Sequence, residues 1–250
     1  MRFLIELSYN GTGFHGWQRQ INAPSIQQEI EEKLSTIFRT ETPIVGCGRT
    51  DTGVHATKYF AHFETDQAFN QTDLIHKLNS MLPAGIAVQT IVPITNDGHA
   101  RFSATKRSYE YRITKVKDPF ATELAYRFNL SLDVEAMNKA CAMMLGEKDF
   151  GCFCKSKADN LTNLCNVFEA KWTDNEDTIV FTISANRFLR NMVRAIVGTM
   201  LEIGQNRMSL QEFQQVLDSK DRTYAGASVP AHGLYLTAVE YPPEIFLPTP

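Results

Sequence analysis

Among the residues that could act in catalysis, Asp51 is the one with the most suggestive neighbours. It lies in the segment 48–53, GRTDTG, which follows an apolar strand pattern and is rich in turn formers. A carboxylate on such a loop can act as a nucleophile or a general base, while Arg49, two positions earlier, can pair with a phosphate. A plain turn aspartate fits the same pattern, so the residues alone leave both interpretations open.

Positive charge is concentrated in two further stretches, although the formal net charge of the chain is −3. On a helix expected over residues 188–203, helical spacing places Arg187, Arg190 and Arg194 on one stripe, opposite an apolar face and without the glutamates of a typical solvated face. Both stretches indicate surfaces for phosphates, with ordinary solvated faces as the alternative. The other stretch, residues 101–117, holds six basic residues against the single acid Glu110: Arg101, Lys106, Arg107, Arg112, Lys115 and Lys117.

A literal G-x-G-x-x-G pattern occupies residues 11–16, directly after a strand pattern. Dinucleotide-binding folds place the third glycine at the start of the helix that meets the pyrophosphate, whereas here the helix is expected only from Ser25. The pattern therefore argues against a nicotinamide or flavin oxidoreductase. Phe14, Trp17 and Arg19 on this loop offer stacking and phosphate contacts, unless the loop is only a surface connection with a buried aromatic ring.

The composition excludes several classes of protein. A chain of 250 residues that is 43% hydrophobic can bury a sizeable core and is neither disordered nor collagen-like. Its first residues lack a signal-peptide pattern, and no apolar run is long enough for a membrane span. Its five cysteines fit reduced thiols, and the Cys152-x-Cys154 spacing is a weak metal signal. We therefore expect a cytoplasmic protein that uses no metal.

The elements that must position these residues form two α+β halves. Hydrophobic periodicity in the first half predicts the order βαββαβ, which is typical of a ferredoxin-like fold. The second half repeats this order less cleanly, with an extra helix over 210–219 before a last strand over 234–241. We expect one domain over 1–105 and another over 106–250, with mixed or antiparallel sheets joined side by side around a central cleft. The first-half elements are expected at residues 2–9, 25–38, 43–48, 59–64, 72–82 and 87–94.

Beside these patterns, the chain resembles the TruA family of tRNA pseudouridine synthases. Residues 48–56, GRTDTGVHA, match the catalytic segment of that family, with Thr52 where alanine is usual. Further matches follow the family order along almost the whole chain. They are residues 9–20 (YNGTGFHGWQRQ), 99–104 (HARFSA), 107–111 (RSYEY), 191–198 (NMVRAIVG) and 233–236 (GLYL).

The resemblance implies an activity and a partner. Members of the family convert uridine at positions 38, 39 and 40 of tRNA, in the anticodon stem-loop, to pseudouridine. They act as homodimers and use neither a metal nor an organic cofactor. Because the reaction breaks the N1–C1′ bond and rejoins the same uracil through C5, it is an isomerisation that needs no redox centre.

The resemblance also assigns roles to individual residues. Asp51 would attack C1′ or remove the 2′ proton to give a glycal, and the sequence does not choose between these courses. Tyr109 would stack on the uracil and assist removal of the C5 proton, and Arg194 would pair with Asp51. Arg49 would support the flipped-out nucleotide and Leu236 would line the base pocket. Five basic residues would contact the RNA: Arg101, Lys106, Arg107, Arg187 and Arg190.

One segment departs from the family pattern, and one alternative function stays open. Between Phe150 and Val167 many relatives carry an arginine, where this chain offers only Lys155 and Lys157. A non-catalytic protein that binds structured RNA would show the same basic stretches without needing Asp51. The absence of an aromatic strand motif of the RNA-recognition type weakens that alternative.

Overall fold

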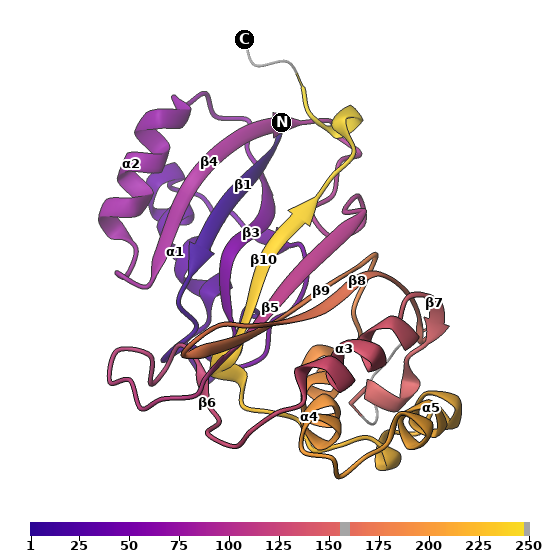
Figure 1. Ribbon diagram of the computed structural model, residues 1–250. Coiled ribbons are helices and arrows are strands. Elements are labelled where there is room, and N and C mark those ends of the chain that lie inside the picture. Colours follow the sequence, from indigo (N-terminus) through magenta and orange to yellow (C-terminus); the bar gives the residue numbers. More distant parts are fainter. Residues whose placement is uncertain (156–160, 248–250) are drawn as a thin grey trace. The chain divides into compact units, whose positions relative to one another are not determined.

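The computed structural model describes residues 1–155 and 161–247, which form two compact units (Figure 1). The first unit contains Met1–Lys106 and the segment that begins at Tyr235, and the second contains Arg107–Leu234. The α+β class predicted from the sequence is confirmed. No helix among the described residues is long and apolar enough to cross a bilayer.

The first unit has the predicted order βαββαβ, to which the chain adds a late strand, β10. Strand β1 pairs antiparallel with both β3 and β4, β2 pairs antiparallel with β3, and β10 runs parallel to β3. The elements are β1 (Arg2–Tyr9), α1 (Ile26–Phe38), β2 (Ile44–Gly46), β3 (His55–Glu64), α2 (Gln71–Met81), β4 (Ile86–Ile94) and β10 (Leu234–Glu240), with a short 3-10 turn at Pro243–Ile245.

Helix α1 shows how the sequence sets the position of an element that later supports the site. Ser25 caps its N-terminus by accepting a hydrogen bond from the backbone N–H of Gln28 at 3.3 Å. The helix ends at Arg39, which adopts a left-handed conformation. Its buried apolar residues recur at helical spacing: Ile26, Ile30, Leu34 and Phe38.

The described residues of the second unit form a mainly antiparallel sheet and three α-helices. Strand β5 pairs with β9, β9 with β8 and β8 with β7, while the short β6 runs parallel to β5. Helix α3 contacts β8, α4 and α5. The elements are β5 (Lys106–Thr114), β6 (Tyr126–Arg127), α3 (Val134–Met143), β7 (Gly146–Asp149), β8 (Leu164–Asp174), β9 (Thr178–Ala185), α4 (Met192–Gly204) and α5 (Leu210–Ser219), with 3-10 turns at Gly151–Phe153, Arg222–Tyr224 and Ala231–Gly233.

Candidate active site

Asp51 lies on the loop between β2 and β3 of the first unit. Its side chain is partly exposed, whereas Thr50 before it is buried and Arg49 is exposed. The loop is attached at its start, because the hydroxyl of Tyr59 on β3 donates to the carbonyl of Gly48. It closes in a turn in which the N–H of Val54 donates to the carbonyl of Asp51 at 3.1 Å. Asp51 therefore sits at the accessible part of a short loop with fixed ends.

The glycine loop of residues 11–16 supports this aspartate loop directly. The N–H of Gly53 donates to the carbonyl of Phe14 at 3.4 Å, and the N–H of Trp17 donates to the carbonyl of Thr50 at 3.2 Å. The N–H of Gly11 donates to Nδ1 of His55 at 3.0 Å, which requires that nitrogen to be unprotonated. Backbone bonds from one loop thus hold the backbone of the other on both sides of Asp51.

Two glycines allow the loops to approach this closely. A Cβ atom at Gly16 would lie 2.3 Å from the carbonyl oxygen of Thr50, and one at Gly11 would lie 2.2 Å from that of Val54. Gly16 also has φ +86°, a backbone conformation that side chains disfavour. The G-x-G-x-x-G pattern thus allows a close contact between two loops, and α1 begins only at Ile26.

Aromatic rings form the layer beneath the aspartate loop. The rings of Trp17 and Tyr59 stack with centroids 4.1 Å apart, and Tyr9 lies 5.5 Å from Tyr59. The hydroxyl of Tyr9 shares a hydrogen bond of 2.9 Å with the hydroxyl of Thr50. Because buried side chains pack densely, this layer supports Thr50, the residue before Asp51, from the core side.

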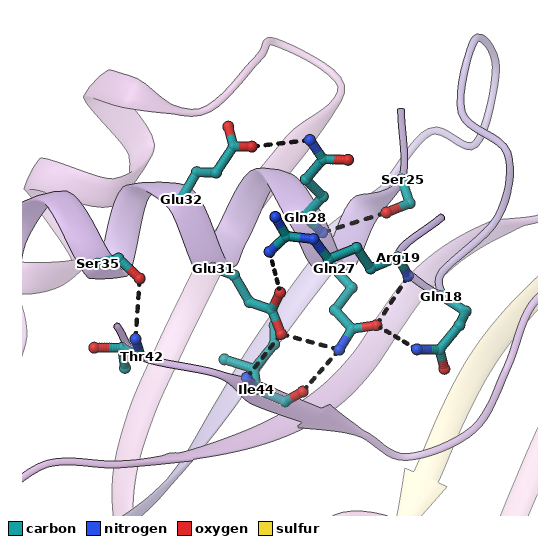
Figure 2. A network of polar contacts seen from close by, with 10 residues as sticks. All are labelled: Gln18, Arg19, Ser25, Gln27, Gln28, Glu31, Glu32, Ser35, Thr42 and Ile44. Atoms are coloured by element: carbon teal, nitrogen blue, oxygen red, sulfur yellow. Dashed lines mark hydrogen bonds and ion pairs between the residues drawn. The ribbon is translucent and has the colours of Figure 1, made fainter. Parts of the chain in front are cut away.

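Helix α1 holds Gln18 and Arg19, which follow the glycine loop and Trp17, as Figure 2 shows. The side-chain oxygen of Gln27 accepts from the N–H of Arg19 and from the side chain of Gln18, both at 3.0 Å. The nearly buried carboxylate of Glu31 accepts from Gln27 at 3.0 Å, from Arg19 at 3.1 Å and from the N–H of Ile44 at 3.1 Å. This network fixes the residues that follow Trp17 to both α1 and β2.

Leu236 lies beside the start of β3, immediately after the aspartate loop. It pairs with Ala56 in the parallel ladder between β10 and β3, and it is 2% exposed. Its neighbour Tyr235 stacks on the ring of His55, with centroids 4.6 Å apart. The first unit therefore places Leu236 close to the end of the aspartate loop.

The second unit carries Tyr109 and Arg194. Tyr109 lies on β5, is partly exposed, and meets Phe188 edge to face with centroids 5.1 Å apart. Arg194 lies in the first turn of α4, where its Nε donates to the carbonyl of Val229 at 2.8 Å. The N–H of Val229 returns a bond to the carbonyl of Arg194 at 3.2 Å. One edge of the guanidinium group is thereby fixed by backbone, which orients the rest of it.

The expected arginine stripe on this helix is wrong. Helix α4 begins at Met192, four residues later than predicted, because Asn191 adopts a left-handed conformation with φ 66° and interrupts the helix. Arg187 and Arg190 therefore precede the helix, and of the three arginines only Arg194 lies on it. The side chain of Asn191 donates to the hydroxyl of Ser228 at 2.6 Å, a tertiary contact that the helical spacing did not reveal.

The remaining basic candidates differ in their surroundings. Arg101 is exposed on the loop after β4, Lys106 pairs with Glu240 at 3.0 Å, and Arg107 donates to the carbonyl of Asn186 at 3.0 Å. Two other cations of this stretch also have acidic partners, since Arg112 pairs with Glu110 and Lys115 with Asp174. The charge of residues 101–117 is thus more nearly balanced than the sequence suggested.

The cysteines are free thiols, and all five are buried. Burial raises the pKa of Cys141 and Cys152 to about 12 and that of Cys165 to about 11, so none of these three is a thiolate at neutral pH. The residues that the structure describes contain no group of three metal-ligating side chains. The N–H of Lys155 bonds the carbonyl of Arg190, and Lys157 lies outside the described residues.

Several supporting groups were not identified from the sequence. Thr50, Tyr59 and His55 hold the aspartate loop, and the carbonyl of Val229 holds Arg194. A backbone carbonyl carries no signal in residue type, so nothing in the sequence marks Val229. The motif of residues 9–20, in contrast, did contain the signal for the glycine loop, because only glycine tolerates such a close backbone approach.

Comparisons with known proteins agree with these motifs. A family model described as tRNA pseudouridine synthase matches residues 140–242. The chain is 50% identical over 246 residues to a tRNA pseudouridine synthase A from Parabacteroides distasonis, with 98% of each chain covered. It is 46% identical to the enzyme of that name from Porphyromonas gingivalis, covering 98% of this chain and 99% of the relative. A relative of the same name from Caldicellulosiruptor bescii is 38% identical, covering 95% of this chain and 98% of the relative.

Proposed function

Since this chain belongs to the tRNA pseudouridine synthase A family and is an enzyme that isomerises uridine in tRNA, we propose that it acts in the anticodon stem-loop, at positions 38, 39 and 40, with Asp51 as its nucleophile. The strongest argument for Asp51 is the set of backbone hydrogen bonds that hold its loop. Backbone groups on both sides of it are bound by the glycine loop, which leaves a partly exposed carboxylate in a fixed place.

In the proposed reaction Asp51 begins the cleavage of the N1–C1′ bond. It either attacks C1′ and leaves the sugar bound to the enzyme, or removes the 2′ proton to give a glycal. The freed uracil turns and C5 bonds to C1′, which breaks the bond from Asp51 to C1′ or, in the glycal course, goes with return of the proton to C2′. The C5 proton then leaves and N1 gains a proton, so product and substrate have the same composition. Tyr109 stacks on the uracil and assists removal of the C5 proton. Leu236 supplies an apolar wall of the base pocket.

Arg194 serves in this proposal as the partner that orients Asp51. The half over 1–105 contributes the nucleophile, and the half over 106–250 contributes Tyr109 and Arg194. Arg194 is suited to this role because a planar guanidinium group can hold both oxygens of a carboxylate, and the bond from its Nε to the carbonyl of Val229 limits its rotation. A carboxylate held in this way keeps its attacking oxygen in one place.

Binding of the RNA involves charge and a flipped nucleotide. Arg49 is exposed, two residues before Asp51, and supports the displaced nucleotide. Phosphate contacts come from Arg101, Lys106, Arg107, Arg187 and Arg190. The family resemblance further supports a homodimer in the cytoplasm that works without a metal or organic cofactor.

The test uses tRNA transcripts that carry a single tritiated uridine labelled at C5. Four transcripts place this uridine at position 38, 39 or 40, or in the acceptor stem. We expect tritium release from the first three and none from the fourth, because the C5 hydrogen leaves only where C5 bonds to C1′. Release from the acceptor-stem transcript would refute the anticodon-loop assignment. Binding of all four transcripts without release from any would favour a non-catalytic RNA-binding protein.

A further inference from the structure

Phe102 is an aromatic side chain held at the surface by a rigid loop. It is 75% exposed and lies in the motif HARFSA, residues 99–104, in the first unit. Single exposed apolar side chains are common and require no explanation. The construction of this loop, however, distinguishes Phe102 from an ordinary exposed side chain.

Hydrogen bonds within the loop hold its backbone. Nδ1 of His99 accepts from the N–H of Arg101 at 3.0 Å and from the N–H of Phe102 at 3.3 Å. The N–H of Ser103 donates to the carbonyl of His99 at 3.0 Å, and the hydroxyl of Ser103 accepts from the N–H of His99 at 3.0 Å. These four bonds close a compact turn whose outward residues are Arg101 and Phe102.

Three side chains from β1, β3 and the residue after β10 hold the same turn, and of these His62 is buried. Nδ1 of His62 accepts from the N–H of Ala100 at 3.1 Å, and the hydroxyl of Tyr241 donates to the carbonyl of Ala100 at 2.6 Å. The guanidinium group of Arg2 donates to the carbonyl of Gly98 at 2.7 Å. The turn is therefore fixed to β1 and β3 and near the end of β10.

The rings form a ladder that runs from the core to the surface. The ring of His62, which is 5% exposed, lies 4.6 Å from that of His99, and the ring of His99 lies 4.4 Å from that of Phe102. The guanidinium carbon of Arg101 lies 5.5 Å from the centroid of Phe102. An exposed ring, fixed from below and flanked by a cation, has the two features that bind a nucleotide: a surface for the base and a charge for its phosphate.

We propose that Phe102 is a stacking platform for an unpaired base of the tRNA substrate. This inference rests on the proposed function, because that function supplies the RNA. Since the turn is ordered before RNA arrives, little conformational entropy is lost when a base stacks on the ring. Phe102 thus contributes to affinity and placement of the tRNA and takes no part in the bond changes at C1′.

The test compares Phe102→Leu, which keeps an apolar side chain but removes the ring, with Phe102→Trp, which keeps a stacking surface. Phe120→Leu is the matched control, because Phe120 is 90% exposed and makes no ring contact among the described residues. Filter binding with one unmodified tRNA transcript measures affinity over a range of salt concentrations, and thermal unfolding checks that each variant folds.

We expect Phe102→Leu to weaken tRNA binding by about 10-fold, whereas Phe102→Trp and Phe120→Leu stay within about 3-fold of the wild type. The dependence of affinity on salt should be unchanged in Phe102→Leu, because no phosphate contact is lost. Wild-type affinity in a folded Phe102→Leu variant would overturn the proposal. So would equal losses in the leucine and tryptophan variants, or a change of oligomeric state in Phe102→Leu, which would make Phe102 a protein contact.

Tritium release by the wild-type enzyme separates the two proposals. If wild-type enzyme releases tritium at positions 38–40 and Phe102→Leu binds tRNA normally, the stacking proposal fails alone. If the wild type releases none there but binding still depends on the ring of Phe102, the anticodon-loop proposal fails and the stacking platform stands.

Discussion

Substitution of Gly16 tests whether the glycine loop positions Asp51, the proposed nucleophile. A Cβ atom at Gly16 would lie 2.3 Å from the carbonyl oxygen of Thr50, whereas real Cβ atoms essentially never come closer than 3.0 Å and ordinary contacts begin at 3.4 Å. In Gly16→Ala the two loops must therefore separate by roughly 0.7–1.1 Å. A displacement of about 1 Å can reduce the rate of a catalysed step on the order of 100-fold. We expect that loss in the single-turnover rate of tritium release, with tRNA affinity nearly unchanged.

Gly13→Ala is the matched control for backbone strain. Gly13 belongs to the same loop and has φ +81°, close to the +86° of Gly16, but a Cβ atom there would meet nothing within 4 Å. Both substitutions carry the same left-handed penalty of about 1–2 kcal/mol, while only Gly16→Ala adds the collision. Equal single-turnover rates in the two variants, with both folded, would refute the claim that the glycine loop sets the position of Asp51.

Three further predictions follow from the site and from the turn that holds Phe102. Arg194→Lys keeps the charge but loses the bond to Val229 and the planar fork of the proposed pairing with Asp51, so single-turnover rates should fall by about 100-fold while filter binding changes little. Arg207→Lys, beyond the end of the same helix, should leave both unchanged. Arg101→Gln should make the fall of log affinity with log salt less steep, by about 0.7–0.9 in the slope. An unchanged slope would mean that Arg101 contacts no phosphate. Burial, with the nearby His99, lowers the pKa of His62 from 6.5 to about 4, so the unfolded chain binds the proton more readily than the folded chain. The free energy of unfolding, measured with urea, should therefore decrease as the pH falls from about 6.5 to about 4. His62→Gln should weaken this pH dependence.

Local patterns predicted most of the elements. The helix expected over residues 25–38 is observed as α1 with Ser25 as its N-cap, and the strand expected over residues 2–9 is observed with the same bounds. These elements follow from neighbouring residues, because a helix or strand that covers a core repeats its apolar residues at its own period.

The details that failed depend on contacts between distant residues. Asn191 interrupts α4 because its side chain bonds Ser228 and its backbone turns left-handed, which the periodicity from residue 188 onward does not reveal. The pairing of Leu236 with Ala56 likewise joins segments at opposite ends of the chain. The motif match identified Asp51, but the support given by Thr50 became visible only in the fold.

The most direct test of the central claim is the single-turnover rate of Asp51→Asn on a tRNA transcript with uridine at position 39. The amide has nearly the shape of the carboxylate but neither its negative charge nor its basicity, so it can neither attack C1′ nor accept the 2′ proton. We predict that the variant folds, binds the tRNA with nearly wild-type affinity through its phosphate contacts, and releases no tritium from C5. Release at even a tenth of the wild-type rate would contradict the assignment of Asp51 as the nucleophile.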